Sequence, residues 1–269
     1  MKKLFFSVAL FGILSACKNK EGGTDNGNNH GPEGPKLVNY SIISTFPHDT
    51  GSYTQGLIIY KGSMYEGTGN YGRSKLRKIN ITTGKAEKEI SLPKEFFGEG
   101  ITILNDTIYQ LTWKENKVFA YTLNDFKKVK EFTVNQDGWG LTTDGKSLIA
   151  TDGSSHLYFY DPSTFKLVKS LDVTEAGGLS YNLNELEYID GFIYANKYEE
   201  PYILKIDPNN GAVVAKIDLS KDWDRIQRMR PDVSPSDIVP NGIAYDAATK
   251  KIYITGKWWP ELYEVQFSQ

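Results

Sequence analysis

One short pattern recurs five times along this sequence and limits the folds that the chain can adopt. A polar or aromatic residue is followed by glycine, once by glutamate, and then by leucine or isoleucine, at intervals of about 40 to 57 residues. The five copies are Gln55-Gly56-Leu57, Glu99-Gly100-Ile101, Trp139-Gly140-Leu141, Asn184-Glu185-Leu186 and Asn241-Gly242-Ile243. Each copy precedes a turn signal and further short segments with the alternation typical of β-strands. Since repeats of this length are typical of propeller blades, the sequence predicts an all-β fold, a five-bladed β-propeller.

The ends of the repeat indicate how the ring closes. Four strands can be assigned in each of the first four units, but the fifth unit reaches Gln269 after three. The segment 37–46, "LVNYSIISTF", precedes the first copy and has the composition of a strand. Pairing this N-terminal strand into the last blade would close the ring and cover an open sheet edge. The additional length in the fourth unit, residues 220–240, is expected to form a loop or short helix over one face.

Propeller geometry predicts which residues meet at the axis. The first strand of each blade lies nearest the axis and the second returns beside it, so the start of one and the end of the other share a face. These positions are Gln55, Glu99, Trp139, Asn184 and Asn241, and then Thr68, Trp113, Asp152, Tyr198 and Lys257. Residues that only pack alike would be small or apolar, so this assortment indicates a small-ligand pocket with aromatic walls.

Several of these residues also have a purely structural interpretation. A glutamate between glycines can be a solvated loop charge, and Trp113 and Trp139 can be core residues. For Asn241, hydrogen bonding to loop backbone groups is the favoured interpretation. Lys257 could be an ordinary solvated lysine, although it directly precedes Trp258. Glu99 is distinguished because none of its four equivalents is acidic.

The N-terminus has the features of a targeting segment. Lys2 and Lys3 precede an apolar run too short to cross a bilayer, and Leu14-Ser15-Ala16-Cys17 resembles a lipoprotein cleavage box. We therefore expect a lipoprotein signal peptide over residues 1–17, with lipid on Cys17, the only cysteine of the chain. Residues 18–36 are rich in Gly and Asn and predict a flexible tether, leaving 37–269 as the propeller domain. This organisation implies a lipid-anchored protein of a bacterial cell envelope, in the periplasm or at the outer membrane; the alternative is an ordinary secretory signal in which Cys17 is incidental.

Composition narrows the possible partners. The formal net charge of the 269 residues is −2 and no basic run is present, so nothing indicates nucleic-acid binding. The three histidines, His30, His48 and His156, show no metal-ligand spacing, and no phosphate loop or nucleophile elbow occurs. We therefore expect no metal and no cofactor. A lipid-tethered monomer is the default expectation.

Seven motifs carry a resemblance to a known family. They are "YTQGL" (53–57), "FGEGIT" (97–102), "QLTW" (110–113), "GWGL" (138–141), "LNELEYIDGFIYAN" (183–196), "NGIAYD" (241–246) and "TGKWWP" (255–260). In this order and at this spacing they resemble the glutaminyl-peptide cyclotransferases of the plant and bacterial type, over roughly residues 40 to 269. The resemblance implies a five-bladed propeller that converts the N-terminal glutamine of peptides or proteins to pyroglutamate and releases ammonia, without a metal.

The resemblance also implies roles for individual residues. It places the catalytic acid/base at Glu99, polar substrate contacts at Gln55, Asn184 and Lys257, and aromatic walls at Trp113 and Trp139. The chain departs from the family pattern at two substrate-binding positions, where Tyr53 replaces the more usual phenylalanine and Tyr198 the more usual tryptophan. Both remain aromatic, so these changes bear on substrate preference and rate.

Two other kinds of function remain open from the residues alone. The oxygens of Glu99, Asn184, Asn241 and Gln55 could hold Ca²⁺, as in a metal-dependent propeller lactonase or esterase, although carboxylates are few and Lys257 is near the same mouth. The chain could also be a non-enzymatic propeller that binds proteins or peptidoglycan at the cell surface.

Overall fold

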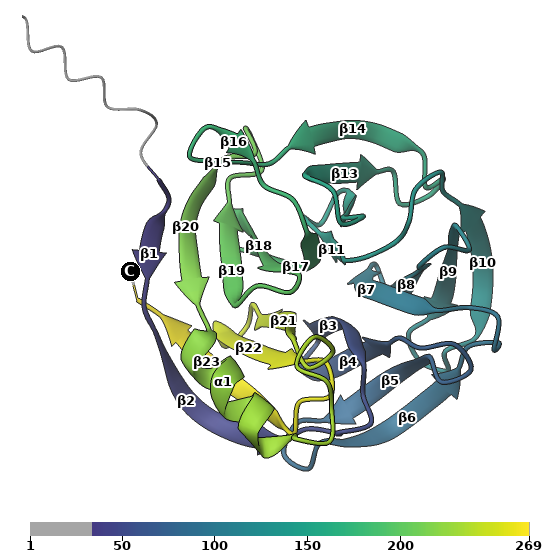
Figure 1. Ribbon diagram of the computed structural model, residues 1–269. Coiled ribbons are helices and arrows are strands. Elements are labelled where there is room, and N and C mark those ends of the chain that lie inside the picture. Colours follow the sequence, from purple (N-terminus) through teal and green to yellow (C-terminus); the bar gives the residue numbers. More distant parts are fainter. Residues whose placement is uncertain (1–33, 269) are drawn as a thin grey trace, which may run out of the picture. The chain divides into compact units, whose positions relative to one another are not determined.

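Five sheets, antiparallel except for one added strand, surround a central axis in the computed structural model, which describes residues 34–268 (Figure 1). The prediction of a five-bladed β-propeller is confirmed, with one repeat unit in each blade. The innermost strands β3, β7, β11, β17 and β21 carry or directly follow the five copies of the sequence pattern. No helix in residues 34–268 is long and apolar enough to cross a membrane.

The strands follow the chain blade by blade. Blades 1 and 2 contain β3 (Thr54–Tyr60), β4 (Ser63–Thr68), β5 (Lys75–Asn80) and β6 (Lys85–Ser91), then β7 (Gly98–Leu104), β8 (Thr107–Thr112), β9 (Lys117–Thr122) and β10 (Lys128–Thr133). Blade 3 contains β11 (Leu141–Thr143), β12 (Leu148–Ala150), β13 (His156–Tyr160) and β14 (Leu167–Asp172), followed by a hairpin of β15 (Thr174–Glu175) and β16 (Gly178–Leu179). Blades 4 and 5 contain β17 (Leu183–Ile189), β18 (Phe192–Lys197), β19 (Tyr202–Ile206) and β20 (Val213–Asp218), then β21 (Pro240–Asp246), β22 (Lys251–Gly256) and β23 (Glu261–Phe267).

The N-terminal segment closes the ring, but it serves two blades. Strand β2 (Tyr40–Pro47) pairs antiparallel with β23 as the outer strand of blade 5, as predicted. Strand β1 (Lys36–Val38) instead pairs parallel with β20 and becomes a fifth strand of blade 4. Assigning all of 37–46 to the last blade was therefore wrong at its start. The chain crosses from one blade to the next at Asn39, so the closing segment joins blades 4 and 5 as well as covering an edge.

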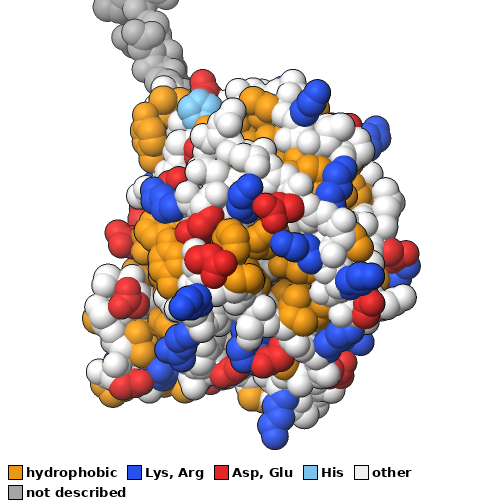
Figure 2. Space-filling model, turned by 90° about the vertical axis from the view of Figure 1, so that its right-hand side faces the viewer, with side chains coloured by type: hydrophobic (Ala, Val, Ile, Leu, Met, Phe, Trp, Pro, Cys, Tyr) orange, Lys and Arg blue, Asp and Glu red, His pale blue; other side chains and the backbone are white. Residues whose placement is uncertain are grey.

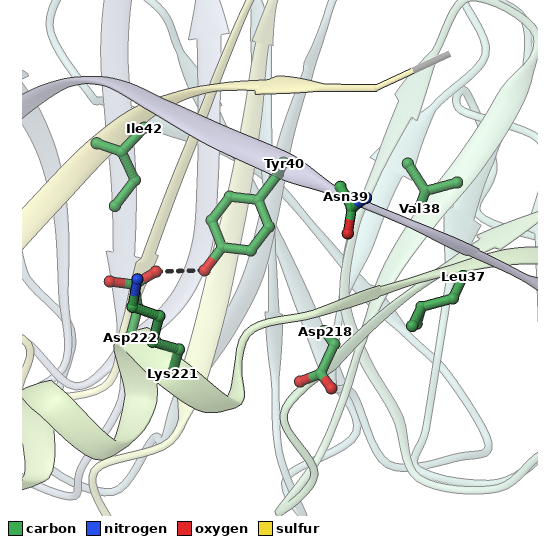
Figure 3. A pocket seen from close by; sticks show the side chains of 8 residues that line it. All are labelled: Leu37, Val38, Asn39, Tyr40, Ile42, Asp218, Lys221 and Asp222. Carbon is green, nitrogen blue, oxygen red and sulfur yellow. Dashed lines mark hydrogen bonds between the residues drawn. The ribbon is translucent and has the colours of Figure 1, made fainter.

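The insertion after blade 4 contains the one α-helix of the described residues, α1 (Ser220–Met229), which packs beside the closing segment. The phenol of Tyr40 on β2 donates a hydrogen bond to Asp222 on α1, at the edge of a cavity of about 380 Å³ between the two elements (Figure 3). Trp223 Nε1 donates to the carbonyl of Ile238 at 2.6 Å, which fastens the helix to the chain that enters β21. The insertion is thus anchored on both sides rather than free.

Close packing of the inner strands explains most of the repeated glycines. A Cβ on Gly56 would lie 2.4 Å from the backbone nitrogen of Ile101, and one on Gly140 would lie 2.2 Å from the carbonyl oxygen of Asn184. At both positions the inner strand of the next blade approaches too closely for any side chain.

The outer surface carries mixed side chains. Charges of both signs are interspersed with apolar side chains on the side seen in Figure 2.

Candidate active site

A cavity of about 210 Å³ opens at the end of the propeller where the inner strands begin. All five blades contribute to it. Its lining consists of Tyr53, Gln55, Asn70, Phe97, Glu99, Trp113, Trp139, Asn184, Tyr198 and Lys257. The eight residues singled out from the sequence for catalysis and substrate binding are therefore brought together around one cavity. It is small for a ligand site and suits one amino-acid side chain better than an extended ligand.

Irregular strand pairing redirects Gln55, Glu99 and Asn184 toward this cavity and Asn241 toward Gln55. The pairing of the first two strands shifts around Gln55 in blade 1, Glu99 in blade 2, Asn184 in blade 4 and Asn241 in blade 5. Such bulges add one unpaired residue, bend the strand and redirect a side chain. The first residue of the repeated pattern is thus the residue that the bulge releases from the regular alternation.

Glu99 is a buried carboxyl held by a short relay of amides. Its side chain is 4% exposed, and Oε1 accepts a hydrogen bond of 3.0 Å from Gln55 Nε2. The other end of that amide, Gln55 Oε1, accepts a bond of 3.2 Å from Asn241 Nδ2, which also donates to the carbonyl of Thr54. Asn241 therefore fixes the Gln55 amide so that its NH₂ faces Glu99. Burial raises the pKa of Glu99 well above its usual range; the positive charge of Lys257 opposes this shift, and Glu115 and Asp137 add to it.

Lys257 is the cationic group of the cavity. Its Nζ lies 4.6 Å from the ring centre of Tyr53 and 4.7 Å from that of Tyr198, so two aromatic faces hold the ammonium. Only 3% of the residue is exposed, and burial lowers its pKa to about 8, although the charge of Glu99 acts in the opposite direction. Because this pKa lies close to neutrality, Lys257 can change its protonation state under working conditions.

Aromatic side chains form the walls. The rings of Trp139 and Tyr198 meet edge to face with their centres 5.4 Å apart, and those of Phe97 and Trp113 are 5.5 Å apart. Gly153 lies directly against the Trp139 ring, where a Cβ would approach to 2.6 Å, so this glycine lets the indole occupy its place. The walls are therefore packed in position before any ligand enters.

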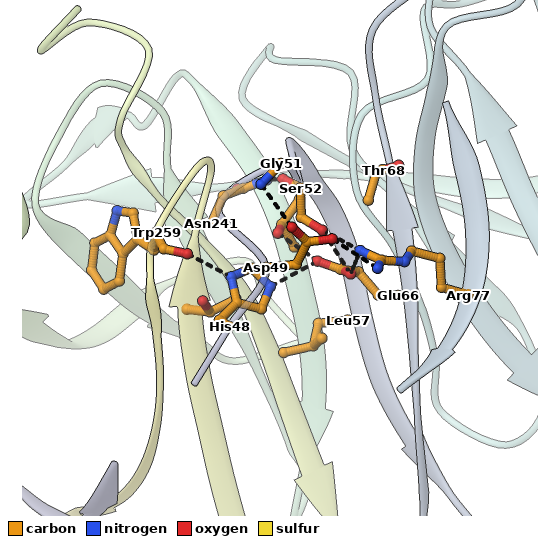
Figure 4. Close-up of polar contacts among 12 residues, drawn as sticks. His48, Asp49, Gly51, Ser52, Leu57, Glu66, Thr68, Arg77, Asn241 and Trp259 are labelled. Carbon is orange, nitrogen blue, oxygen red and sulfur yellow. Dashed lines mark hydrogen bonds and ion pairs between the residues drawn. The ribbon is translucent and has the colours of Figure 1, made fainter. Parts of the chain in front are cut away.

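A buried ionic network joins blades 5 and 1 (Figure 4). His48 Nε2 is 2.9 Å from Glu66 Oε1, its Nδ1 is 2.8 Å from the carbonyl oxygen of Trp259, and Arg77 contacts both Glu66 and Asp49. Burial alone would lower the pKa of His48, but the charge and hydrogen bond of Glu66 outweigh burial and raise it. The network ties the loop that enters β3 to the loop that carries Lys257.

Sequence reasoning missed some residues and included others that lie elsewhere. Phe97 and Asn70 line the cavity but were not predicted; Phe97 stands two residues before Glu99, as Tyr53 stands before Gln55, and that equal offset was the available signal. Thr68 and Asp152 were grouped with the mouth, but Thr68 Oγ1 accepts a bond from the backbone of Lys75, and Asp152 accepts one from Tyr158. Asn241 bonds to Thr54 and Gln55 rather than lining the cavity, in agreement with the favoured interpretation.

Comparison with known proteins assigns the family. The sequence model of the glutamine cyclotransferase family matches residues 9–267. The chain belongs to the glutamine cyclotransferase family. It is 39% identical over 239 residues to the glutaminyl-peptide cyclotransferase of Arabidopsis thaliana, an alignment that covers 87% of this chain and 73% of the relative.

The fold of this chain is also similar to that of a solved structure. The crystal structure of glutaminyl cyclase from Myxococcus xanthus superposes with a TM-score of 0.80 at 32% identity, covering 87% of this chain and 98% of the other. These findings favour the transferase interpretation over the lactonase and the binding propeller. The described residues, 34–268, contain no group of three or more His, Cys, Asp or Glu side chains arranged to hold a metal ion.

Proposed function

We propose that this member of the glutamine cyclotransferase family is a glutaminyl-peptide cyclotransferase that uses Glu99 as its general acid and base. The substrate is the N-terminal glutamine of a peptide or protein, and the products are the pyroglutamyl peptide and ammonia. The observation that carries the proposal is a buried carboxyl with a raised pKa in the lining of a small aromatic cavity that a buried lysine also lines.

The reaction needs orientation and proton transfer. The α-amine attacks the γ-carboxamide carbon of the same residue, a C–N bond forms, and the bond to the amide nitrogen breaks. Both partners belong to one residue, so holding the side chain in a folded conformation supplies much of the rate. Trp113, Trp139 and Tyr198 offer flat surfaces that can enforce that conformation, and the volume of about 210 Å³ leaves little room for an extended side chain.

Glu99 can carry the proton from the nucleophile to the leaving group. The carboxylate takes a proton from the α-amine as the new bond forms and returns it to the amide nitrogen, which departs as neutral ammonia. A carboxyl with an ordinary pKa would be a weak base at neutral pH, and the burial that raises the pKa of Glu99 brings its basicity nearer to the working pH.

The remaining polar groups serve charge and orientation. Negative charge develops on the carboxamide oxygen in the tetrahedral intermediate, and the Lys257 ammonium is the cation available in the cavity to stabilise it. Asn184 Oδ1 is buried and has no hydrogen-bond partner among the described residues, so it is an acceptor for an N–H of the substrate. Gln55 is already engaged with Glu99 and Asn241, which favours a role in setting the position of Glu99.

Ammonia release from a glutamine-initiated dipeptide tests this function. We expect ammonia and pyroglutamyl product in equal amounts, at the same rate with and without a chelator, and none from a dipeptide that begins with asparagine. Ammonia release lost on chelation would contradict a metal-free mechanism, and no ammonia under either condition would favour the lactonase or the binding propeller.

We further propose that the protein is a lipid-anchored monomer of a bacterial cell envelope, attached through Cys17. Cys17 lies outside the described residues, and the support is the sequence pattern of residues 1–17. Wild-type protein should incorporate labelled fatty acid and sediment with membranes, whereas Cys17→Ala should do neither. Label retained by the Cys17→Ala variant would contradict the anchor site.

A further inference from the structure

The fourth blade breaks the repeated pattern at a second position, which the proposed mechanism does not use. Four copies of the pattern have glycine in the middle, whereas the copy in β17 has Glu185. This carboxyl is 1% exposed, and burial together with the neighbouring carboxyl of Glu187 raises its pKa. The equivalent position in the other four copies is glycine, so a buried acid at this position requires a structural reason.

The carboxyl of Glu185 joins the inner strands of three blades. Its Oε2 accepts a hydrogen bond of 2.7 Å from the backbone N–H of Ile243 in blade 5. Its Oε1 accepts one of 3.1 Å from the N–H of Leu57 in blade 1, which is not a neighbour of blade 4 in the ring (Figure 1). The side chain therefore reaches past blade 5 and occupies the axis, where the glycines of the other copies let strands touch directly.

Each contact of this carboxyl adjoins a residue of the candidate site. Leu57 stands two residues after Gln55, and Ile243 stands two residues after Asn241, the residue that orients the Gln55 amide. Asn184, which lines the cavity and whose buried Oδ1 has no partner among the described residues, directly precedes Glu185. One carboxyl thus fixes the backbone beside the hydrogen bond from Gln55 to Glu99 and beside a substrate contact.

We propose that Glu185 is a positioning residue for the cyclisation reaction, which holds β3, β17 and β21 at the spacing that keeps Gln55 and Asn184 in place around Glu99. The proposal rests on the proposed function, because its readout is the activity of that site. Glu185 itself does not touch the cavity and transfers no proton.

Glu187 on the same strand provides a matched control. It is also buried, at 6% exposure, and burial raises its pKa to about 8. Its oxygens accept bonds from the backbone N–H of Tyr245 at 3.2 Å and from Thr142 Oγ1 at 2.9 Å. Thr142 stands three residues after Trp139 and Tyr245 four after Asn241, farther along their strands from the site than the partners of Glu185, so Glu187 should link blades with less effect on the site.

The experiment compares Glu185→Gln and Glu187→Gln in steady-state ammonia release across pH 5–9, with thermal unfolding of each variant. Both should lower Tm, because the Glu185 amide places its NH₂ against a backbone N–H and the Glu187 amide loses the oxygen that accepts from Thr142 Oγ1. Only Glu185→Gln should lower kcat, by about tenfold or more, since small misplacements of reacting groups cost that much. The acid limb of its pH profile should also move to higher pH, because a displaced Gln55 no longer stabilises ionised Glu99. If Glu185→Gln does not fold, Glu185→Asp keeps the acid but shortens its reach and should show the same loss in weaker form.

Three results would overturn the proposal. The first is a Glu185→Gln enzyme with the kcat and acid limb of the wild type. The second is an equal loss of kcat in both glutamine variants, which would mean a general loosening of the ring. The third is failure of both Glu185 variants to fold, which would assign the carboxyl to stability alone. A wild-type protein without ammonia release would instead refute the proposed function.

Discussion

Replacing Glu99 with glutamine would separate the chemistry of the cavity from its architecture. The amide has the shape of the carboxyl, and its carbonyl oxygen can still accept the bond that Gln55 Nε2 gives to Oε1. The variant should therefore fold, but its side chain cannot take a proton from the α-amine. General acid–base catalysis contributes about 10²–10⁴-fold, so kcat should fall by that factor, equivalent to about 2.7–5.4 kcal/mol in the activation free energy.

The groups that remain in the cavity decide where in this range the loss falls. Burial raises the pKa of both Tyr53 and Tyr198, so neither phenol can replace the carboxylate as a base. Lys257, with a pKa of about 8, is the alternative, and its charge is partly maintained by Glu99. Without the charge of Glu99 the pKa of Lys257 should fall below about 8, so the loss should be largest in acid, where Lys257 stays protonated, and approach 10⁴-fold there. Residual activity should increase toward pH 8, where neutral Lys257 becomes abundant.

Thermal stability gives an independent readout of the same carboxyl. The folded protein holds the Glu99 proton more tightly than the unfolded chain, because burial raises the pKa above 4.5 in the folded state. Ionisation of Glu99 therefore lowers the free energy of unfolding as the pH rises from about 4.5 through the pKa of the folded state. The Glu99→Gln variant has no carboxyl to ionise and does not lose this stability. Its Tm should match the wild type near pH 4 and exceed it at pH 9. A kcat within threefold of the wild type at pH 6 would refute the catalytic role, and a lower Tm at pH 9 would refute the raised pKa.

Three further substitutions test the surroundings of Glu99. Lys257→Met removes a charge that lowers the pKa of Glu99, so the acid limb of kcat/KM should move to higher pH; an unchanged limb would show that the two groups are not coupled. Asn241→Ala frees the Gln55 amide to rotate, so the acid limb of kcat/KM should again move to higher pH and kcat should fall by about tenfold. A wild-type pH profile would contradict the hydrogen-bond relay from Asn241 through Gln55 to Glu99. His48→Leu removes one partner of a buried ion pair and should cost about 3–5 kcal/mol of unfolding free energy at pH 6. Because the pKa of His48 is raised above 6.5, its contribution is complete below that pH and is lost as the pH rises through the folded pKa, so the difference from the wild type should shrink in alkaline solution.

The architecture could be predicted from the sequence because each blade repeats the same local structural elements. A turn, an alternating strand and a glycine required by close packing recur with little change, and five copies leave few other folds. The pairing partner of the first strand, β1, could not be predicted in this way. Leu37 and Val38 have the same β-forming character as the residues of β2, and only the space beside β20 determines that they join blade 4.

Residues of the site could be predicted at the strand ends that meet at the axis and where the repeat is interrupted at an anticipated position. Glu99 was recognised because its equivalents are not acidic, whereas Glu185 interrupts the same pattern one position later and was not. Its role depends on how far apart three inner strands lie, which no local pattern reports. The network of His48, Glu66 and Arg77 has no sequence periodicity at all, since it forms between a closing loop and two strands of the next blade.

These differences follow from how a ring of equal blades can become an asymmetric site. Close contact of inner strands at Gly56 and Gly140 leaves no room for functional groups, so chemistry requires bulges that release side chains toward one end. A buried carboxyl that accepts backbone N–H groups from two other blades adds a further contact between the inner strands. On this reasoning Glu99, which we propose transfers the proton, and Glu185, which we propose holds the strands, depend on each other, and losing either should impair turnover by a different route.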